Sequence, residues 1–212
     1  MMEVGAALLT DVKQGLCCKK PRDRDSIIKG FTLLETLVVV MIMGIMAAVA
    51  TPSWLRFVSD QRLFAAQSKI YGVMKQSQNN AIRTQKTWEA CFREQNDRIQ
   101  WSVHQPGSDT CAPAGIVWND LGVESIQIYN QKNDKNECET TLYQSGTSCT
   151  GTGPWRVQFN YLGHVNGRLG QITIVTNNNN QNQRCIYVST LLGALRKGEK
   201  HERANGSDKY CY

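Results

Sequence analysis

The sequence predicts an α+β protein in which one long N-terminal helix packs against antiparallel β-sheets. Three observations predict this class. An apolar run occupies residues 31–52, helical periodicity continues after it to about residue 84, and short β-prone runs separated by Gly, Asn, Asp and Pro make up the remainder. We expect a helix with a membrane half and an amphipathic half, followed by a sheet-rich part that disulfides tie together.

A basic leader comes first, over residues 1–30. It holds six Lys and Arg residues against four Asp and Glu residues, with most of the basic ones close to the apolar run. Basic residues beside a membrane segment stay in the cytoplasm, so the C-terminal part is expected to be translocated. Without the leader's +2, the total of +6 leaves +4 for residues 31–212. This mildly basic balance permits acidic partners without arguing for them.

The apolar run over residues 31–52 has one ionisable side chain, Glu35. As a helix it is about 30 Å long, enough to cross the apolar core of a bilayer. A carboxylate in hydrocarbon costs on the order of 3 kcal/mol, so Glu35 requires a partner. Small residues at Gly44, Ala47 and Ala48 let neighbouring helices approach closely. Pro52 lacks an N–H, so we expect a bend or a local break there.

The hexapeptide Gly-Phe-Thr-Leu-Leu-Glu at residues 30–35, followed by the apolar helix and Pro52, resembles the processing site of type IV pilins and type II secretion pseudopilins. The resemblance implies that a membrane prepilin peptidase cleaves between Gly30 and Phe31, that Phe31 becomes N-methylated, and that Glu35 guides assembly. Cleavage leaves a cationic amine about one helical turn from Glu35. If Glu35 meets the amine of a neighbouring subunit, the pair fixes an axial register, because an unpaired buried charge is unfavourable.

Two other interpretations of the apolar run stay open. Ala48-Val49-Ala50 is an Ala-x-Ala site of the kind that ends a secretory signal peptide, and cleavage there would release a soluble chain beginning at Thr51. The run could also be a simple membrane anchor, with Glu35 near the interface. Neither interpretation accounts for the whole hexapeptide.

The helical pattern continues over residues 53–86 as an amphipathic helix. Apolar residues recur there at intervals of three and four, while polar residues that include Asp60, Gln67 and Lys69 occupy much of the other face. We expect the apolar stripe to pack against the sheet-rich part, since aromatic residues at this spacing belong to a core more often than to a binding site.

Residues 87–212 change to the period of β-strands. The clearest alternation is Trp-Arg-Val-Gln-Phe-Asn-Tyr at residues 155–161, and residues 166–167 and 177–180 have the composition of hairpin loops. A helix followed by antiparallel strands also resembles the GspH/FimT branch of the pilin family, which implies two small sheets. The expected strands are Thr87–Glu94, Arg98–His104, Ile116–Asn119, Ser125–Tyr129, Trp155–Tyr161, Gln171–Thr176 and Arg184–Thr190.

Six cysteines follow the leader, and an even number in a translocated domain indicates three disulfides. We favour pairs of sequence neighbours: Cys91–Cys111, Cys138–Cys149 and Cys185–Cys211. Zinc is the rival interpretation, but no two of these cysteines have CxxC spacing and the three histidines are scattered, so no metal is expected. Cys17 and Cys18 lie in the cytoplasmic leader and are assigned no structural disulfide.

No catalytic constellation is visible in the sequence. The glycine-rich stretch at residues 146–153 lacks the lysine and the following helix of a phosphate-binding loop. His104, His164 and His201 match neither a nucleophile elbow nor a paired-carboxylate pattern. We therefore expect a protein that is not an enzyme and that needs no cofactor.

A basic segment near the C-terminus offers a possible contact with DNA phosphates through Arg196, Lys197, Lys200 and Arg203. DNA-uptake pilins resembling this branch carry a Gly-Arg-x-Arg signature, of which Gly193 and Arg196 match and Ala194 departs. Glu199 and Glu202 lower the local charge. The alternative is a solvated tail or a contact between subunits, which is the usual role of such charge runs.

Together these features predict a structural subunit, a minor pilin of a type IV pilus that helps to initiate assembly near the fibre tip. The alternatives are a type II secretion pseudopilin and a DNA-binding minor pilin for DNA uptake. The resemblance implies as partners the major and minor pilins, the prepilin peptidase and the inner-membrane assembly platform, with lipid around the helix before assembly. We expect a single-pass protein of the bacterial inner membrane whose C-terminal domain is periplasmic, later incorporated in the fibre.

Overall fold

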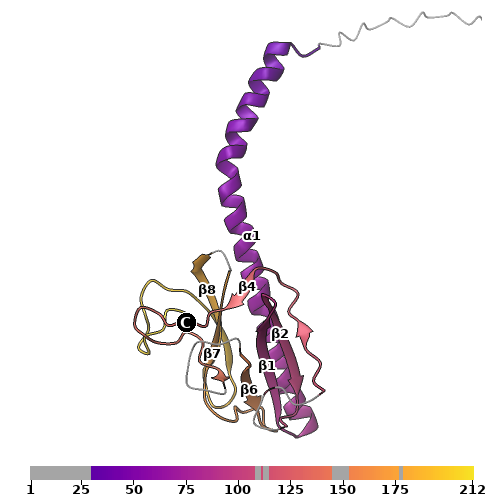
Figure 1. Ribbon diagram of the computed structural model, residues 1–212, viewed down its shortest axis with the longest axis vertical. Helices are drawn as coiled ribbons and strands as arrows, with labels where there is room; N and C mark the ends of the chain where they lie inside the picture. Colours follow the sequence, from indigo (N-terminus) through magenta and orange to yellow (C-terminus); the bar gives the residue numbers. More distant parts are fainter. Residues whose placement is uncertain (1–29, 108–110, 112–114, 145–152, 177–178) are drawn as a thin grey trace, which may run out of the picture. The chain divides into compact units, whose positions relative to one another are not determined.

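The computed structural model describes residues 30–107, 111, 115–144, 153–176 and 179–212 (Figure 1). The chain divides into two compact units, residues 1–46 and residues 47–212. The first unit contains the beginning of the long helix α1 (Leu33–Thr84), and the second contains the remainder of α1 and both β-sheets. Predicted features within residues 1–29, among them Cys17 and Cys18, lie outside the described residues.

Helix α1 begins with a side-chain cap. The backbone N–H of Glu35 donates to Thr32 Oγ1 at 3.2 Å, which satisfies one of the N–H groups that a helix leaves unpaired at its start. The helix runs through Pro52 without interruption, so the local break that we considered there is absent. It ends at Thr84, where Gln85 adopts a positive φ of 53°.

The first sheet has five antiparallel strands in the order β3-β2-β1-β6-β5. Its centre is the hairpin of β1 (Trp88–Gln95) and β2 (Arg98–His104), whose two-residue loop, Asn96-Asp97, has φ values of 54° and 55°. Such positive values are typical of the tight turn that matches strand twist. The outer strands are β3 (Asn119–Asp120), β6 (Trp155–Phe159) and β5 (Tyr143–Gln144).

The second sheet has four antiparallel strands in the order β4-β7-β8-β9. They are β4 (Ile126–Ile128), β7 (Gln171–Thr176), β8 (Asn179–Val188) and β9 (Leu195–Glu199). All six residues of β7 are buried, as expected for a central strand covered on both faces.

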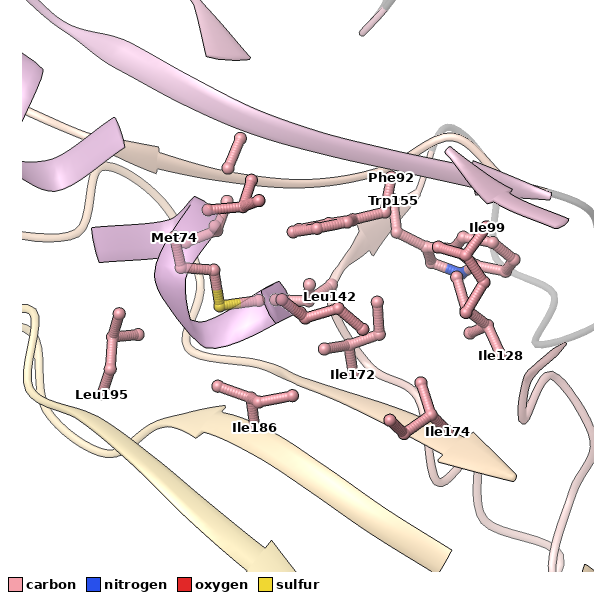
Figure 2. Packing of buried hydrophobic residues seen from close by; sticks show 14 of the residues in the cluster. Met74, Phe92, Ile99, Ile128, Leu142, Trp155, Ile172, Ile174, Ile186 and Leu195 are labelled. Atoms are coloured by element: carbon pink, nitrogen blue, oxygen red, sulfur yellow. The ribbon is translucent and has the colours of Figure 1, made fainter. Parts of the chain in front are cut away.

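The core lies between α1 and the two sheets. Figure 2 shows Met74 of α1 between Phe92 and Trp155 of the first sheet and Ile172 and Ile186 of the second, and all five side chains are almost fully buried. The protein is therefore α+β, as the sequence predicts, with one helix serving both sheets.

Disulfides fasten peripheral segments to this framework. Cys91 of β1 is bonded to Cys111, and Cys185 of β8 is bonded to Cys211, each pair with a Cα–Cα distance of 6.0 Å. These are two of the pairs favoured from the sequence. Cys138 is disulfide-bonded as well, but its expected partner Cys149 lies outside the described residues.

The strand predictions need four corrections. Strand β8 begins at Asn179, not at Arg184, and takes in residues 179 and 180 of the expected hairpin loop, because Asn179 already pairs with Thr176 of β7. Of the expected run Ile116–Asn119, only Asn119 belongs to a strand, β3, whose two residues pair with Gln100 and Trp101 of β2. Strand β5 was not predicted, since its two residues are too short a run to show a period. Strand β9 was interpreted as part of a polar tail, because its inner side includes the long polar side chain of Lys197.

Candidate functional site

The candidate site is the N-terminal segment from Gly30 to Pro52, which contains the predicted cleavage point. Gly30 and Phe31 precede α1, and the Phe31 side chain is 77% exposed. Glu35 lies in the first turn of the helix and is exposed. Gly30 and Phe31 are both exposed ahead of the capped helix, so the peptide bond between them is not covered by the rest of the described chain. The carboxylate of Glu35 lies where the positive end of the helix dipole favours it.

The apolar stretch of α1 meets the length and composition needed to cross a membrane, and none of it is buried within the described chain. Its large side chains point outward all around the helix. A helix that is apolar on every side and covered by nothing requires lipid or other helices around it. The exposed large residues of this stretch are Leu33, Leu34, Leu37, Val38, Val39, Val40, Met41, Ile42, Met43, Ile45, Met46 and Val49.

Exposed apolar surface continues past Pro52 to Trp54, Leu55 and Phe57. Proline at position 52 removes one backbone hydrogen bond of the helix. The hydroxyl of Thr51, the residue before this proline, donates to the carbonyl of Ala47 one turn earlier, at 2.7 Å. The helix thus remains continuous as far as the residues where it meets the sheets.

The basic residues proposed for DNA contact do not form a free tail. Arg196 and Lys197 belong to β9, and Lys197 Nζ donates to Ser68 Oγ at 3.1 Å while lying 5.0 Å from the centre of the Tyr71 ring. The backbone of Lys200 forms an isolated antiparallel β-bridge with that of Cys211, and the carbonyl of Arg203 accepts a hydrogen bond from the Tyr212 hydroxyl at 3.2 Å. The four side chains are exposed, but Lys197 is engaged with α1.

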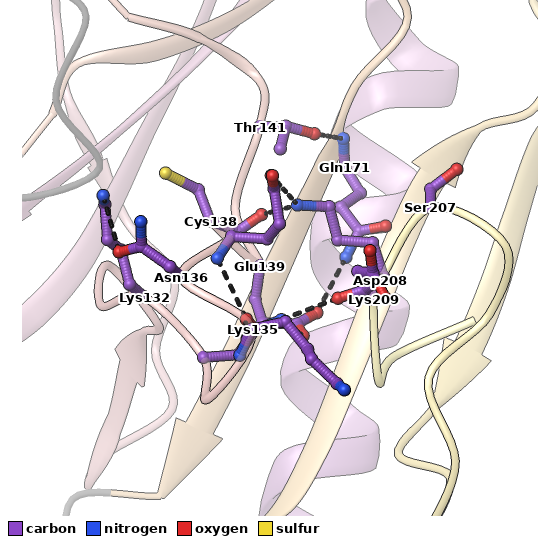
Figure 3. Close-up of polar contacts among 12 residues, drawn as sticks. Lys132, Lys135, Asn136, Cys138, Glu139, Thr141, Gln171, Ser207, Asp208 and Lys209 are labelled. Atoms are coloured by element: carbon purple, nitrogen blue, oxygen red, sulfur yellow. Dashed lines mark hydrogen bonds and ion pairs between the residues drawn. The ribbon is translucent and has the colours of Figure 1, made fainter.

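A buried carboxylate, Glu139, joins the loop after β4 to the C-terminal segment (Figure 3). Its Oε1 accepts hydrogen bonds from Asn133 Nδ2 at 2.8 Å and from the Tyr210 backbone N–H at 2.9 Å. Lys209 Nζ donates to the Cys138 carbonyl and lies 3.5 Å from Glu137. This network was not predicted, because nothing in the sequence tells a buried glutamate from the exposed ones beside it.

A second buried carboxylate lies on the first sheet. Glu89 of β1 is within 3.3 Å of His104 Nδ1, accepts a hydrogen bond from Gln158 Nε2 at 2.8 Å and lies 3.7 Å from Arg156. Among the described residues, Glu89, Cys91 and His104 are the group close enough to hold a metal ion. The sulfur of Cys91 is in a disulfide, however, so no thiolate is available there.

Comparison with known proteins bears on the N-terminal segment. One protein-family model, described as the prokaryotic N-terminal methylation motif, matches residues 26–51. The N-terminal segment of this chain therefore carries that methylation motif. The match covers the predicted cleavage point and Glu35.

Similar solved structures are two crystal forms of the type IV minor pilin FimU from Pseudomonas aeruginosa. The first shares 10% identity, covers 66% of this chain and 90% of the FimU chain, and has a TM-score of 0.43. The second shares 11% identity, covers 64% and 91%, and has a TM-score of 0.41. No curated protein matches this chain.

Proposed function

We propose that the chain is a minor pilin, a structural subunit that is cleaved between Gly30 and Phe31, methylated on Phe31, held in the inner membrane by α1 and then built into a type IV pilus. The observation that carries this proposal is the coincidence of the methylation motif at residues 26–51 with a helix whose apolar stretch is uncovered. A helix in this condition is suited first to lipid and then to the apolar helices of other subunits.

In this proposal Glu35 fixes the axial position of one subunit's helix relative to that of its neighbour. Once the chain begins at Phe31, the new amine and the Glu35 carboxylate are separated by about one turn at the start of the same helix. Among apolar helices an unpaired carboxylate is unfavourable, so a subunit gains when Glu35 meets the amine of its neighbour. The peripheral sheets then present the contacts that select neighbours. The proposed place of this subunit is the initiating complex near the tip.

The deciding experiment expresses the full chain with a prepilin peptidase and measures the intact mass and the N-terminal sequence. The expected product begins at a methylated Phe31 and stays in the membrane fraction. A soluble product beginning at Thr51 would identify an ordinary signal peptide instead and would remove Glu35 from the mechanism. An uncleaved chain that stays in the membrane would show that the apolar run is a simple membrane anchor.

A type II secretion pseudopilin shares the processing motif and the uncovered helix, so it is the alternative within the same structural class. The filament that contains the chain decides between them. Sheared surface fibres containing the processed chain support the pilus, whereas retention in the periplasm with secretion components supports the pseudopilin. DNA uptake is tested by measuring DNA binding at low and at high salt. Binding that weakens with salt and is lost when Arg196, Lys200 and Arg203 are neutralised would support it.

A further inference from the structure

Two similar β-turns lie side by side at the C-terminal end of α1, the lower end of Figure 1. One turn, Asn160–Gly163, follows β6, and the other, Thr190–Gly193, precedes β9. Each is closed by the N–H of its glycine donating to the carbonyl of its first residue, at 2.8 and 3.0 Å respectively. The central positions of both turns hold large apolar residues: Tyr161 and Leu162 in the first turn, Leu191 and Leu192 in the second.

One buried glutamine of α1 fixes both turns. Gln78 Nε2 donates to the carbonyl of Gly163 at 2.7 Å and to the carbonyl of Gly193 at 2.9 Å. The two glycines have φ values of +77° and +82°, which other residues adopt with strain. A Cβ added at Gly163 would also come within 2.8 Å of the Ile82 side chain. The hydrogen bonds from Gln78 and the conformations of the two glycines therefore hold both turns in place against α1.

The composition of these turns contradicts the usual preference. Central turn positions normally carry Gly, Pro, Asn, Asp or Ser, whereas here four large apolar side chains are 54–69% exposed, with Ile82 of α1 beside them at 49%. Contiguous exposed apolar surface of this kind marks an interaction site. We call it the turn patch, and it consists of Ile82, Tyr161, Leu162, Leu191 and Leu192.

The segments that build the turn patch contain no acidic residue. Asp and Glu are absent from residues 61–88 and again from residues 140–198. Arg83 and Lys86 are exposed next to Ile82, and Lys75 Nζ donates to Gln78 Oε1 at 2.9 Å. The surroundings of the patch are therefore basic, which favours an anionic partner.

We propose that the turn patch docks on a bilayer that contains anionic phospholipid. Apolar side chains at the apex of a turn can enter the boundary between headgroups and acyl chains, while nearby Lys and Arg side chains are attracted to anionic headgroups. A bilayer also needs no shape complementarity to two adjacent protruding turns. The patch uses none of the residues of the processing segment, so this activity can be tested apart from cleavage and from the pairing of Glu35.

The test uses the full chain with α1 embedded in phosphatidylcholine nanodiscs, so that the apolar helix is already occupied. Protein-free vesicles are added, made either of phosphatidylcholine or of phosphatidylcholine mixed with phosphatidylglycerol, and co-flotation of the nanodiscs is measured. Flotation is expected with the anionic vesicles and much less with the neutral ones. The double variant Leu162→Ser, Leu192→Ser should bind the anionic vesicles about tenfold more weakly.

The matched control is the double variant Val117→Ser, Leu169→Ser, which changes two exposed apolar residues outside the patch. It should float like the unchanged chain, and intact disulfides with an unchanged melting temperature verify folding of both variants. The pair Arg83→Gln, Lys86→Gln should reduce binding to anionic vesicles by about tenfold or more.

Three results would overturn the proposal. Equal flotation of the patch variant and the control variant would show that the patch does not carry the contact. Equal binding to neutral and anionic vesicles would show that the Lys and Arg side chains near the patch do not contribute to binding. Pairing of nanodiscs with each other in place of vesicles would assign the patch to contacts between copies of the chain.

Discussion

Gln67 is a buried polar residue whose hydrogen bonds hold α1 against the second sheet. It is 1% exposed, and its Nε2 donates to the Cys185 carbonyl at 2.9 Å and to the Gly198 carbonyl at 2.8 Å. The helical pattern placed Gln67 on the polar face, and this was wrong. The residue lies beside the apolar stripe, where one backbone carbonyl of β8 and one of β9 act as acceptors, and no sequence period reveals them.

Replacing Gln67 with Ala should lower the free energy of unfolding by about 1–3 kcal/mol, because it removes both hydrogen bonds and leaves a void against the sheet. Thermal unfolding of the full chain in detergent measures this. The control is Gln61→Ala on the exposed side of the same helix, which should change stability by less than about 0.5 kcal/mol. Equal effects of the two variants would contradict the assigned role.

Glu94 gives a pH-dependent prediction. Burial raises the pKa of Glu94 above its usual value of 4.5, partly opposed by the hydrogen bond that its carboxylate accepts from the Ile128 backbone N–H, while Asp97 nearby raises it further. The folded state therefore favours the protonated form. Its contribution to stability is present below pH 4.5 and is lost as the pH rises through the folded-state pKa.

The variant Glu94→Gln should consequently gain stability relative to the unchanged chain as the pH rises from the acidic side toward neutrality. Glutamine keeps a side-chain oxygen that can accept from the Ile128 N–H but cannot ionise. Melting temperatures measured across this pH range provide the test. A difference between the two proteins that does not change with pH would contradict the prediction.

At the scale of elements, the strands whose bounds the sequence predicted correctly are those in which β-prone residues continue over six or seven positions. Strand β2 has the predicted bounds Arg98–His104, and β7 has the predicted bounds Gln171–Thr176. Helix α1 also ends at Thr84 as expected. The elements that were missed are short or sit at an edge, such as β9, where pairing with β8 and not local composition determines the structure.

The C-terminal segment depends on one crosslink, so the double variant Cys185→Ser, Cys211→Ser should loosen it. Loss of a disulfide that closes a loop of 26 residues costs about 2–5 kcal/mol. Hydrogen exchange should accelerate in residues 200–212, where Tyr212 exchanges backbone hydrogen bonds with Glu199 of β9 and Cys211 is bridged to Lys200. The β1–β2 hairpin serves as the internal reference. Unchanged protection of residues 200–212 would show that the Glu139 network alone holds them.

For the whole molecule, the processing motif and the uncovered helix were both readable from the sequence, since each is a local and contiguous pattern. The Glu139 network and the turn patch were not, because each joins residues far apart in the chain. Gln78 and the two turns that it fixes are separated by 85 and 115 residues. Such sites emerge only once the sheets are formed.

Replacing Glu35 with Gln should leave cleavage after Gly30 intact but reduce incorporation into filaments, because the neighbouring amine then meets no carboxylate. The comparison of the membrane fraction with sheared fibres measures both steps. Met41→Leu, an apolar exchange in the same helix, is the control and should assemble normally. Full incorporation of the Glu35 variant would exclude the proposed pairing.

Two of the disulfides, Cys91–Cys111 and Cys185–Cys211, also determine how the sheet-bearing unit responds to tension. In the proposed filament, load would reach the sheets through α1, and any unfolding would then lengthen the chain. Cys91–Cys111 and Cys185–Cys211 enclose separations of 20 and 26 residues. At about 3.4 Å per extended residue, they withhold roughly 70 and 90 Å of contour length from extension. A subunit stretched in its oxidised form should therefore yield by a shorter step than the same subunit after reduction.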